Sequence, residues 1–223
     1  MPAASGKFIT LEGGEGTGKS TQSRLLSTAL QQHGLEVVLT REPGGAPGAE
    51  LIRKLLVEGD HARWDVMTEA LLLFAARRTH LRETIIPALT RGDWVICDRF
   101  SDSTLAYQGD AGGLGHAVLK RLAAIALGAD SPVPHLTLVM DIPAELGLAR
   151  AKLRGDAENR FESLGLAFHQ RLRDSFLRIA RQEPDRCSLI DAAPDPETVA
   201  KAIFAAVSSR LGQGWAETGS GDG

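Results

Sequence analysis

The chain lacks several features that mark specialised classes of protein. Its 223 residues include only two cysteines, with no C-x-x-C motif and no Cys/His spacing typical of a metal site. No apolar run approaches the roughly 20 residues that a membrane-spanning helix needs. The formal net charge is −3, so no overall positive field favours a nucleic-acid partner. These absences favour an ordinary globular protein that contacts neither membranes nor nucleic acids.

The chain ends and the cysteines support the same view. Residues 1–6 lack the charged and apolar regions of a signal peptide, so we expect a cytoplasmic location. Cys97 and Cys187 lie in apolar stretches and are expected to be buried, reduced thiols. The length suits a single domain over residues 1–211. The Gly-rich residues 212–223 are expected to form a disordered tail.

What the chain does have is a phosphate-binding motif near its start. Residues 13–20, GGEGTGKS, match the P-loop pattern G-x-x-x-x-G-K-[ST]. The apolar stretch 7–12 before it predicts a buried strand. Leucines and alanines at helical spacing after it predict a helix from Ser20 to about Gln32. Strand, glycine loop and helix form the context that the motif requires, which makes a chance match improbable.

The motif predicts how a nucleoside triphosphate is held. Glycines let backbone N–H groups converge on phosphate oxygens, and the helix N-terminus adds positive potential there. Lys19 would reach the β- and γ-phosphates, and the Ser20 hydroxyl would hold Mg²⁺. The residues expected to bind ATP are Gly13, Gly14, Glu15, Gly16, Thr17, Gly18, Lys19, Ser20 and Thr21. A P-loop alone does not say what the phosphoryl group is used for.

Apolar strands alternate with helical segments along the rest of the chain. This alternation predicts an α/β fold, a three-layer P-loop NTPase sandwich whose five-stranded parallel sheet has helices on both faces. The expected strands after the first are 35–40, 94–97, 136–140 and 187–190. The expected helices after the first are 51–57, 68–90 (long or broken), 114–127, 144–180 (interrupted near residue 155) and 195–211. Ligands of such sheets bind at the carboxyl ends of the strands.

Charged residues follow two of these strands. Arg41 precedes a Pro-Gly turn, where it could clamp a phosphate or simply lie on the surface. Asp98 ends an apolar strand, as a Walker-B carboxylate does, and could reach Mg²⁺. Arg99 follows it and could bind a second anion, although an internal Asp98–Arg99 ion pair would account for both residues. Two arginines beside a P-loop lysine suggest an anionic acceptor in addition to the triphosphate.

Two helical segments carry further candidates. Phe74 shares a helix face with Arg77 and Arg78, an arrangement that could stack and bind a base, although an apolar core position for Phe74 is the simpler interpretation. A basic lid, at about residues 150–160, contains Arg150, Lys152, Arg154 and Arg160. Such a segment could close over the triphosphate and neutralise the transferring phosphoryl group. A solvated basic helix face would look the same.

Together these segments resemble the thymidylate kinase family in its bacterial form. The resemblance extends from about Phe8 to Ile190. The markers follow the family's order: the P-loop with acidic Glu15 at its third position, REPG at 41–44, LFAAR at 73–77, DRF at 98–100, TLAYQG at 104–109 and the basic segment 150–160.

The resemblance implies an ATP- and Mg²⁺-dependent kinase of dTMP, a small-molecule substrate, in a protein that is usually a homodimer. The implied dTMP site contains Glu15 at the 3′-hydroxyl, Arg41 and Arg99 at the phosphate, Phe74 and Arg77 at thymine, Thr104 and Gln108 beside the base, and Tyr107 beside the sugar. Ser20 and Asp98 are the implied Mg²⁺ ligands. The implied catalytic residues are Lys19, Asp98, Arg99, Arg150 and Arg154.

Some assignments stay open at this point. Many family members place the stacking Phe and the base-binding Arg four residues apart, which would select Arg78. Counting back from residues 86–89 selects Arg77 instead. Two other functions are also possible: a kinase of another nucleotide, or a P-loop ATPase or GTPase switch. The chain has no Asn-Lys-x-Asp sequence for reading guanine.

Overall fold

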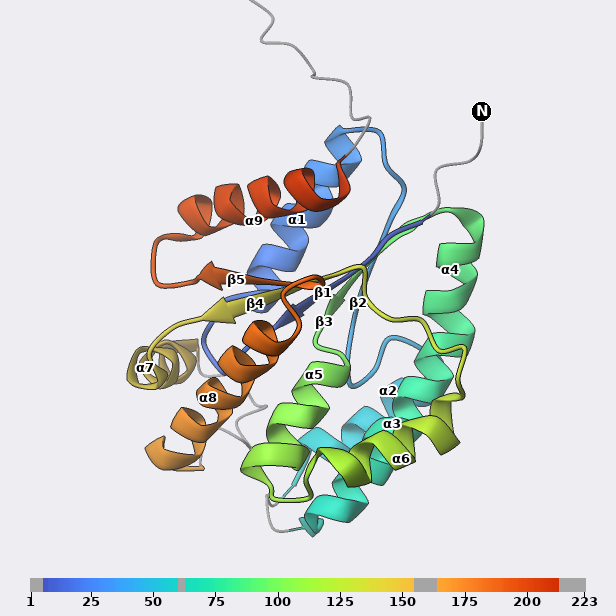
Figure 1. Cartoon of the computed structure of the whole chain (residues 1–223), viewed down its shortest axis with the longest axis vertical. Coiled ribbons are helices and arrows are strands. Elements are labelled where there is room, and N and C mark those ends of the chain that lie inside the picture. The colour runs from blue at the N-terminus through green and yellow to red at the C-terminus, as the bar shows by residue number, and fades with distance from the viewer. Residues whose placement is uncertain (1–5, 60–62, 155–163, 213–223) are drawn as a thin grey trace, which may run out of the picture.

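A computed structural model describes residues 6–59, 63–154 and 164–212. Five parallel strands form one sheet in the order β2-β3-β1-β4-β5 (Figure 1). The strands are β1 Phe8–Glu12, β2 Val37–Arg41, β3 Trp94–Asp98, β4 Leu136–Asp141 and β5 Cys187–Asp191. All five expected strands are confirmed, and the parallel pairing follows from their nearly unbroken apolar runs.

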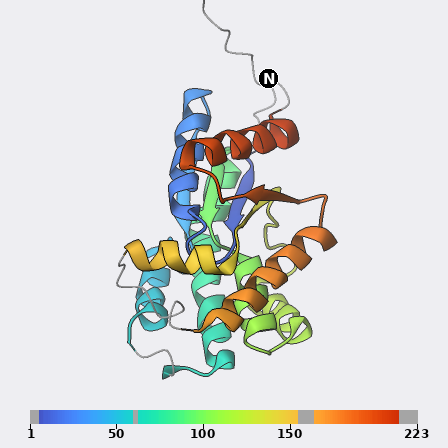
Figure 2. The same ribbon diagram turned by 90° about the vertical axis from the view of Figure 1, so that its left-hand side faces the viewer.

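Helices cover both faces of the sheet, as expected. The helical elements are α1 Lys19–Gln32, α2 Pro47–Val57, α3 Val66–His80, η2 Leu81–Ile85, α4 Ile86–Arg91, α5 Ser101–Thr104, η3 Leu105–Ala111, α6 His116–Leu127, α7 Ala144–Arg154, α8 Leu166–Gln182 and α9 Pro196–Leu211. In Figure 1, α1 and α9 lie on one side of the sheet and α4, α5 and α8 on the other. Figure 2 shows β5 between α9 and α8.

Alternating side chains of the central strands fill two cores. Ile9 and Leu11 of β1 point toward α1 and α9, where they meet Leu30 and Ile203. Phe8 points to the other face, into a cluster formed by η2, α4 and β3. The period of two along each strand therefore places the P-loop helix on one face and the segment after β3 on the other.

The long helix expected at 68–90 is continuous, but it changes from α-helical to π-helical hydrogen bonding and back again. It begins at Asp65, whose side chain accepts a hydrogen bond from the Thr68 N–H at 2.7 Å. The chain then stays helical from Val66 to Arg91, with a π-helical turn, η2, between α3 and α4.

One helical region was not expected. Residues 101–111 form α5 and η3, directly after Arg99 and Phe100. The interruption expected near residue 155 and the tail from residue 213 lie outside the described residues, and the single-domain organisation stays a prediction. Within the described ranges, no helix is both long and apolar enough to cross a membrane.

Candidate active site at the carboxyl ends of the strands

The P-loop wraps from β1 into α1 and carries the lysine expected to bind phosphate. Gly18 precedes the helix with a φ of +85°, a conformation that favours glycine. The ammonium group of Lys19 donates to the Gly14 carbonyl at 2.7 Å and to Thr17 Oγ1 at 3.2 Å. Burial, with a contribution from the nearby Arg99, lowers the pKa of Lys19 to about 8. The cation is thus held by neutral oxygens of its own loop.

A glycine of α7 packs directly against the P-loop, a contact that no sequence pattern predicts. A Cβ on Gly147 would lie 2.5 Å from the Glu15 carbonyl oxygen. A Cβ on Gly16 would lie 2.0 Å from the Gly147 carbonyl oxygen. Neither position can carry a side chain unless one backbone moves. The helix that leads toward the basic segment therefore touches the phosphate-binding loop itself.

Ser20 and Asp98 meet beside the P-loop. The Ser20 hydroxyl donates to Asp98 Oδ2 at 2.5 Å. A hydroxyl and a carboxylate are the hard oxygen donors that Mg²⁺ accepts, and Mg²⁺ usually takes only one or two protein ligands. The donor set therefore fits Mg²⁺ at the position the motif predicts. The described ranges contain no cluster of three or more metal-ligating side chains.

Arg99 is the centre of a polar cluster between β1 and β3. Its guanidinium donates to Glu15 at 2.8 Å, to the Gly13 carbonyl at 3.0 Å and to Ser103 Oγ at 3.3 Å. Tyr107 donates to the same Glu15 oxygen at 2.6 Å. Burial would raise the pKa of Glu15, but the charges of Arg99 and Lys19 and the Tyr107 hydroxyl outweigh it and hold the pKa at about 2. Asp98 and Arg99 thus have separate partners.

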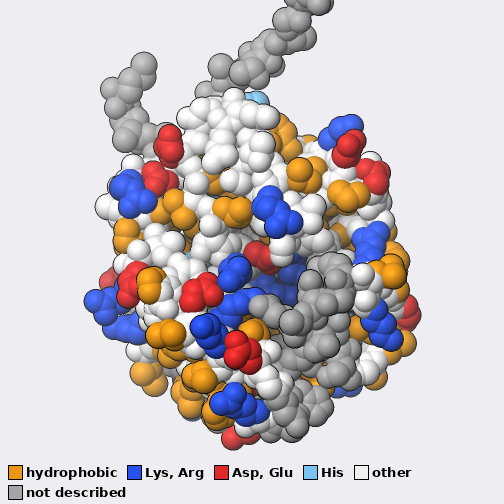
Figure 3. Space-filling view, turned by 180° about the vertical axis from the view of Figure 1, so that it is seen from behind, with side chains coloured by type: hydrophobic (Ala, Val, Ile, Leu, Met, Phe, Trp, Pro, Cys, Tyr) orange, Lys and Arg blue, Asp and Glu red, His pale blue; other side chains and the backbone are white. Residues whose placement is uncertain are grey.

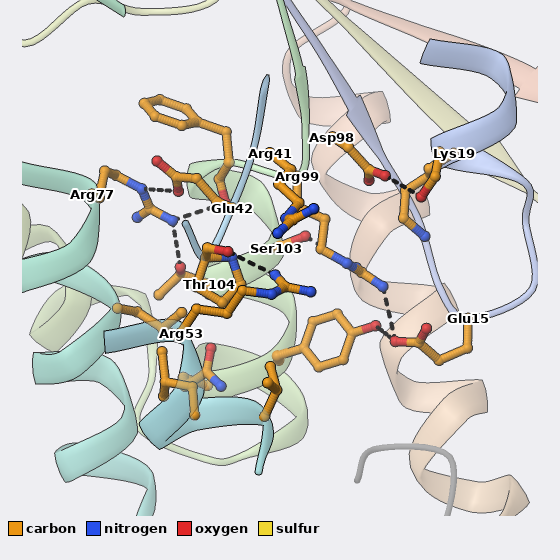
Figure 4. Close-up of a pocket in the computed structure, with 18 of the residues that line it drawn as sticks. Glu15, Lys19, Arg41, Glu42, Arg53, Arg77, Asp98, Arg99, Ser103 and Thr104 are labelled. Carbon is orange, nitrogen blue, oxygen red and sulfur yellow. Dashed lines mark hydrogen bonds and ion pairs between the residues drawn. The ribbon is translucent and has the colours of Figure 1, made fainter. Parts of the chain in front are cut away.

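A cavity of about 240 Å³ opens from this cluster toward α2 and α3 (Figure 4). Its lining includes residues from the P-loop, the start of α1, the ends of β2 and β3, and the helical elements α2, α3, α5 and η3. The sequence-predicted residues among them are Glu15, Gly16, Gly18, Lys19, Ser20, Arg41, Arg77, Asp98, Arg99, Thr104, Tyr107 and Gln108. On the face opposite Figure 1, Lys and Arg side chains gather in a hollow (Figure 3).

The far end of the cavity is built around Arg77, which is only 2% exposed. Its guanidinium donates to Glu42 at 2.7 Å, to the Phe100 carbonyl at 3.0 Å and to Thr104 Oγ1 at 2.9 Å. Its Nη1 is buried and has no hydrogen-bond partner in the described part of the chain. Arg78 is exposed, lies outside the cavity lining, and donates to the Ala126 carbonyl. The geometry therefore favours Arg77, the residue that the spacing left in competition with Arg78.

The structure does not place Phe74 in the cavity. Phe74 is 4% exposed and packs with Ala70 and Leu119 between α3 and α6. Leu73, its neighbour, lines the cavity instead. Adjacent helical residues point about 100° apart, so a shift of one position along α3 exchanges a core side chain for a cavity side chain. This arrangement fits the interpretation of Phe74 as a core residue.

Three polar lining residues were missed by the sequence reasoning. Arg53, on α2, donates to the Pro43 carbonyl at 2.6 Å and faces the cavity. Glu69, on α3, accepts a hydrogen bond from Gln108 at 3.1 Å. Ser103 lies on α5, the helix that the sequence did not predict. The spacing of Arg53 from Arg41 resembles no motif, so only the packing of α2 against α3 could reveal it.

Arg41 and Arg150 lie in more exposed settings. Arg41 lines the cavity but its side chain is 53% exposed, and it pairs with Glu50 at 3.2 Å. Arg150 lies outside the cavity lining and donates to the Ala192 and Ala193 carbonyls, at 2.7 and 2.6 Å. The Arg154 side chain and Arg160 lie outside the described part of the chain. A catalytic role for Arg150 or Arg154 stays a prediction.

Comparisons with known proteins identify the family of the chain. The family model described as thymidylate kinase matches residues 11–203. A thymidylate kinase of Caulobacter vibrioides is 55% identical over 93% of this chain and 98% of its own length. One from Rhodopseudomonas palustris is 52% identical over 92% and 90%. The crystal structure of thymidylate kinase from Ehrlichia chaffeensis superposes with a TM-score of 0.74 at 32% identity, covering 91% of this chain and 98% of that one. The chain belongs to the thymidylate kinase family, whose members are ATP-dependent nucleotide kinases.

Proposed function

We propose that this chain transfers the γ-phosphoryl group of ATP to the phosphate of dTMP, giving ADP and dTDP. The observation that carries the proposal is one continuous cavity with the P-loop at one end and the buried Arg77 at the other. The first end suits a triphosphate. The second offers a fixed, unpartnered N–H to an uncharged polar atom such as a base carbonyl oxygen.

The reaction needs positioning and charge neutralisation more than acid–base chemistry. An oxygen of the acceptor phosphate forms a bond to the γ-phosphorus. The bond between that phosphorus and the β,γ-bridging oxygen breaks, and ADP leaves with the electron pair. The acceptor oxygen is already anionic, so no general base is required. Lys19 and Arg99 supply positive charge close to the reacting groups.

Ser20 and Asp98 would hold Mg²⁺, which neutralises charge on the β- and γ-phosphates when bound. Arg99, Arg41 and Arg53 would hold the acceptor phosphate. The Glu15 carboxylate would accept a hydrogen bond from the 3′-hydroxyl of dTMP. Tyr107 would lie beside the sugar. Arg77 would donate to a thymine carbonyl, with Thr104 and Gln108 nearby. Leu73 replaces Phe74 as the apolar wall of the base site.

The basic lid would complete the donor side. Arg154, the last residue of α7, is the first candidate for the catalytic cation. Arg150 would contribute only after leaving the two carbonyls that hold it. A cytoplasmic location also remains part of this proposal.

A coupled assay of ADP release with ATP, Mg²⁺ and a panel of monophosphates tests the activity. We expect strong preference for dTMP, weaker use of dUMP, and AMP, GMP and CMP near background. ADP formed equally fast without any acceptor would indicate an ATPase. Equal rates with several monophosphates would indicate a broader nucleotide kinase.

The wall of the base site has its own test. Leu73→Ala is expected to raise the KM for dTMP while leaving the KM for ATP nearly unchanged. Phe74→Ala is expected to lower thermal stability more than it changes either KM, because it opens a core cavity. A selective loss of dTMP binding in Phe74→Ala would restore the stacking role to Phe74.

A homodimer is the second part of the proposal. The neighbouring helices α2, α3 and α6 carry exposed Leu51 (67% exposed), Leu71 (51%) and Ile125 (83%). Exposed apolar side chains mark a protein interface where they form one patch, and a second copy of the chain would cover them. Light scattering should give twice the chain mass, and Leu71→Asp should reduce it to the mass of one chain.

A further inference from the structure

The carboxylate of Glu12 lies at the end of β1, beneath the site but outside the cavity lining. The side chain is fully buried. It accepts a hydrogen bond from the Phe100 N–H at 2.8 Å and another from the Ser103 hydroxyl at 2.5 Å. A buried carboxylate is costly to desolvate, so it is normally kept only where it makes hydrogen bonds or ion pairs that the protein needs. The proposed reaction assigns it none.

Ser103 connects Glu12 to Arg99. A serine hydroxyl has one proton and two lone pairs. Ser103 gives its proton to Glu12, so only lone pairs remain for the Arg99 Nη1 that approaches it at 3.3 Å. The direction of every hydrogen bond in this short chain is therefore set by the acceptor at its end. An ionised Glu12 makes Ser103 an acceptor for the guanidinium.

The backbone of Arg99 needs the same support. Its φ is +68°, in the left-handed region that a non-glycine residue seldom adopts. Its N–H bonds the Leu11 carbonyl at 2.9 Å, and the next N–H, of Phe100, bonds Glu12. Glu12 thus holds the chain immediately after the unusual residue as well as the serine that touches its side chain.

We propose that Glu12 and Ser103 are positioning residues for Arg99, acting as a relay in which the ionised carboxylate orients the Ser103 hydroxyl and so directs the guanidinium toward the acceptor phosphate. The relay rests on the proposed role of Arg99 at that phosphate. Protonation of Glu12 weakens the relay. The protonated carboxyl group donates to one of the two lone pairs of the Ser103 oxygen, so only one lone pair remains for Arg99, and the Ser103 proton is no longer held away from the guanidinium.

The surroundings of Glu12 raise its pKa, so its protonation, and the loss of Ser103 orientation that follows, occur near neutral pH. Burial, followed by the negative charge of Asp102, raises the pKa of Glu12 to about 7, against the opposing effects of Ser103, Arg99 and the Phe100 N–H. Asp102 is itself paired with Arg186 at 2.7 Å. The titratable or charged groups around Glu12 come from β3 and its following loop, α1, α5 and the start of β5: Cys97, Arg99, Lys19, Asp102, Arg186 and Cys187.

Glu12→Gln and Ser103→Ala test the relay. In Glu12→Gln the amide oxygen can accept from Phe100 only if the amide nitrogen donates to Ser103, so this variant imitates the protonated state. Ser175→Ala is the matched control, because Ser175 is also a buried serine that donates to a carboxylate, that of Asp110 on η3. Arg99→Lys tests the underlying role of Arg99 separately.

We expect about a tenfold rise in the KM for dTMP in both relay variants, the loss of a hydrogen bond to a charged group. The KM for ATP should change less than about twofold, and the control should match the wild type. Between pH 6 and 8.5, the wild-type KM for dTMP should fall as pH rises through about 7. Glu12→Gln should lack this component, while titration of the dTMP phosphate is common to all variants.

Unchanged KM for dTMP in both relay variants would overturn the relay, as would parallel losses for ATP and dTMP that track thermal stability. If Glu12→Gln and Ser103→Ala leave the KM for dTMP unchanged while Arg99→Lys raises it strongly, the relay is wrong and the role of Arg99 at the phosphate stands. If Arg99→Lys also leaves the KM for dTMP unchanged, the proposed phosphate site itself is wrong.

Discussion

The two ends of the cavity hold their cations in different ways. At the acceptor end, charged side chains bind one another: Arg77 binds Glu42, which also binds His80, and Arg99 binds Glu15. At the donor end, Lys19 is held by the Gly14 carbonyl and a hydroxyl. Arg150, on α7 outside the cavity lining, is likewise held by two carbonyls.

This difference suggests that the acceptor end recognises dTMP and that the donor end carries out phosphoryl transfer. Ion pairs between buried or partly buried side chains keep a fixed geometry, which suits recognition of one base and one sugar. A neutral carbonyl is a weaker partner than a phosphate oxygen, so a lysine or arginine held by carbonyls can transfer to a triphosphate. Substitutions at the acceptor end should therefore affect stability and specificity. Substitutions at the donor end should affect turnover.

The largest expected effect is at Lys19. Lys19→Met should lower kcat by about 10³-fold or more, because it removes a preorganised charge from the transferring phosphoryl group. Stability should hold or rise at pH 7. Burial lowers the lysine pKa in the folded state, so its charged form costs stability in full at pH values below about 8, and methionine removes that cost. Steady-state kinetics and thermal unfolding measure both. A large drop in melting temperature would contradict this view of the donor end.

Arg77 should show the opposite pattern. Arg77→Met leaves the buried Glu42 without its guanidinium partner and should destabilise the fold by roughly 3–5 kcal/mol. The KM for dTMP should rise by about 10²-fold, the upper range for a lost hydrogen bond from a charged group. Urea unfolding and kinetics measure the two effects. Arg78→Met is the control, and an equal loss of dTMP binding there would reopen the choice between the two arginines.

Gly147 packs against the backbone of the P-loop at the donor end. Gly147→Ala places a Cβ against the Glu15 carbonyl and should raise the KM for ATP by about tenfold, since one or two P-loop hydrogen bonds are displaced. Helix propensity favours alanine by about 1 kcal/mol, so a general loss of α7 would not explain the result. Gly48→Ala in α2 is the control, because its Cβ would meet only the Thr79 methyl, at 3.2 Å. A Gly147→Ala enzyme with wild-type kinetics would show that the P-loop shifts freely.

Arg150 should give the smallest effect. Arg150→Ala is expected to lower kcat by about fivefold, because the side chain must exchange two carbonyls for phosphate contacts worth about 1 kcal/mol more. Arg154→Ala should cost more. If both variants keep kcat within twofold of the wild type, the lid assignment is wrong.

Much of the fold could be predicted from the sequence because its strands are buried. A short apolar run such as 136–140, bounded by polar residues and turns, is typical of a strand inside a parallel sheet, and each such run begins or ends within one or two residues of the observed strand. The P-loop was equally clear, since its glycines and lysine are needed at fixed positions. Arg77 and Arg99 also face the cavity as expected.

The rest depends on contacts between distant segments. Helices α5 and η3 were not predicted because their polar residues turn inward: Asp102 to Arg186 and Ser103 to Glu12. No apolar stripe therefore marks them. Gly147 resembles any helical glycine until the P-loop is placed beside it. Leu73 and Phe74 differ by a single helical position, which spacing alone could not resolve.

The π-helical turn η2 has a consequence for how this chain can vary. A turn closed by i→i+5 hydrogen bonds contains more residues than an α-helical turn, so the helix faces a new direction after passing through it. Before η2, Arg77 faces the cavity. Within and after it, Leu81, Ile85 and Ala88 face the sheet. A deletion of one residue in 81–85 would restore a regular helix and swing Arg77 by roughly a quarter-turn relative to the sheet. Insertions or deletions within residues 81–85 should therefore be more harmful than conservative substitutions there, because they rotate Arg77 out of the cavity.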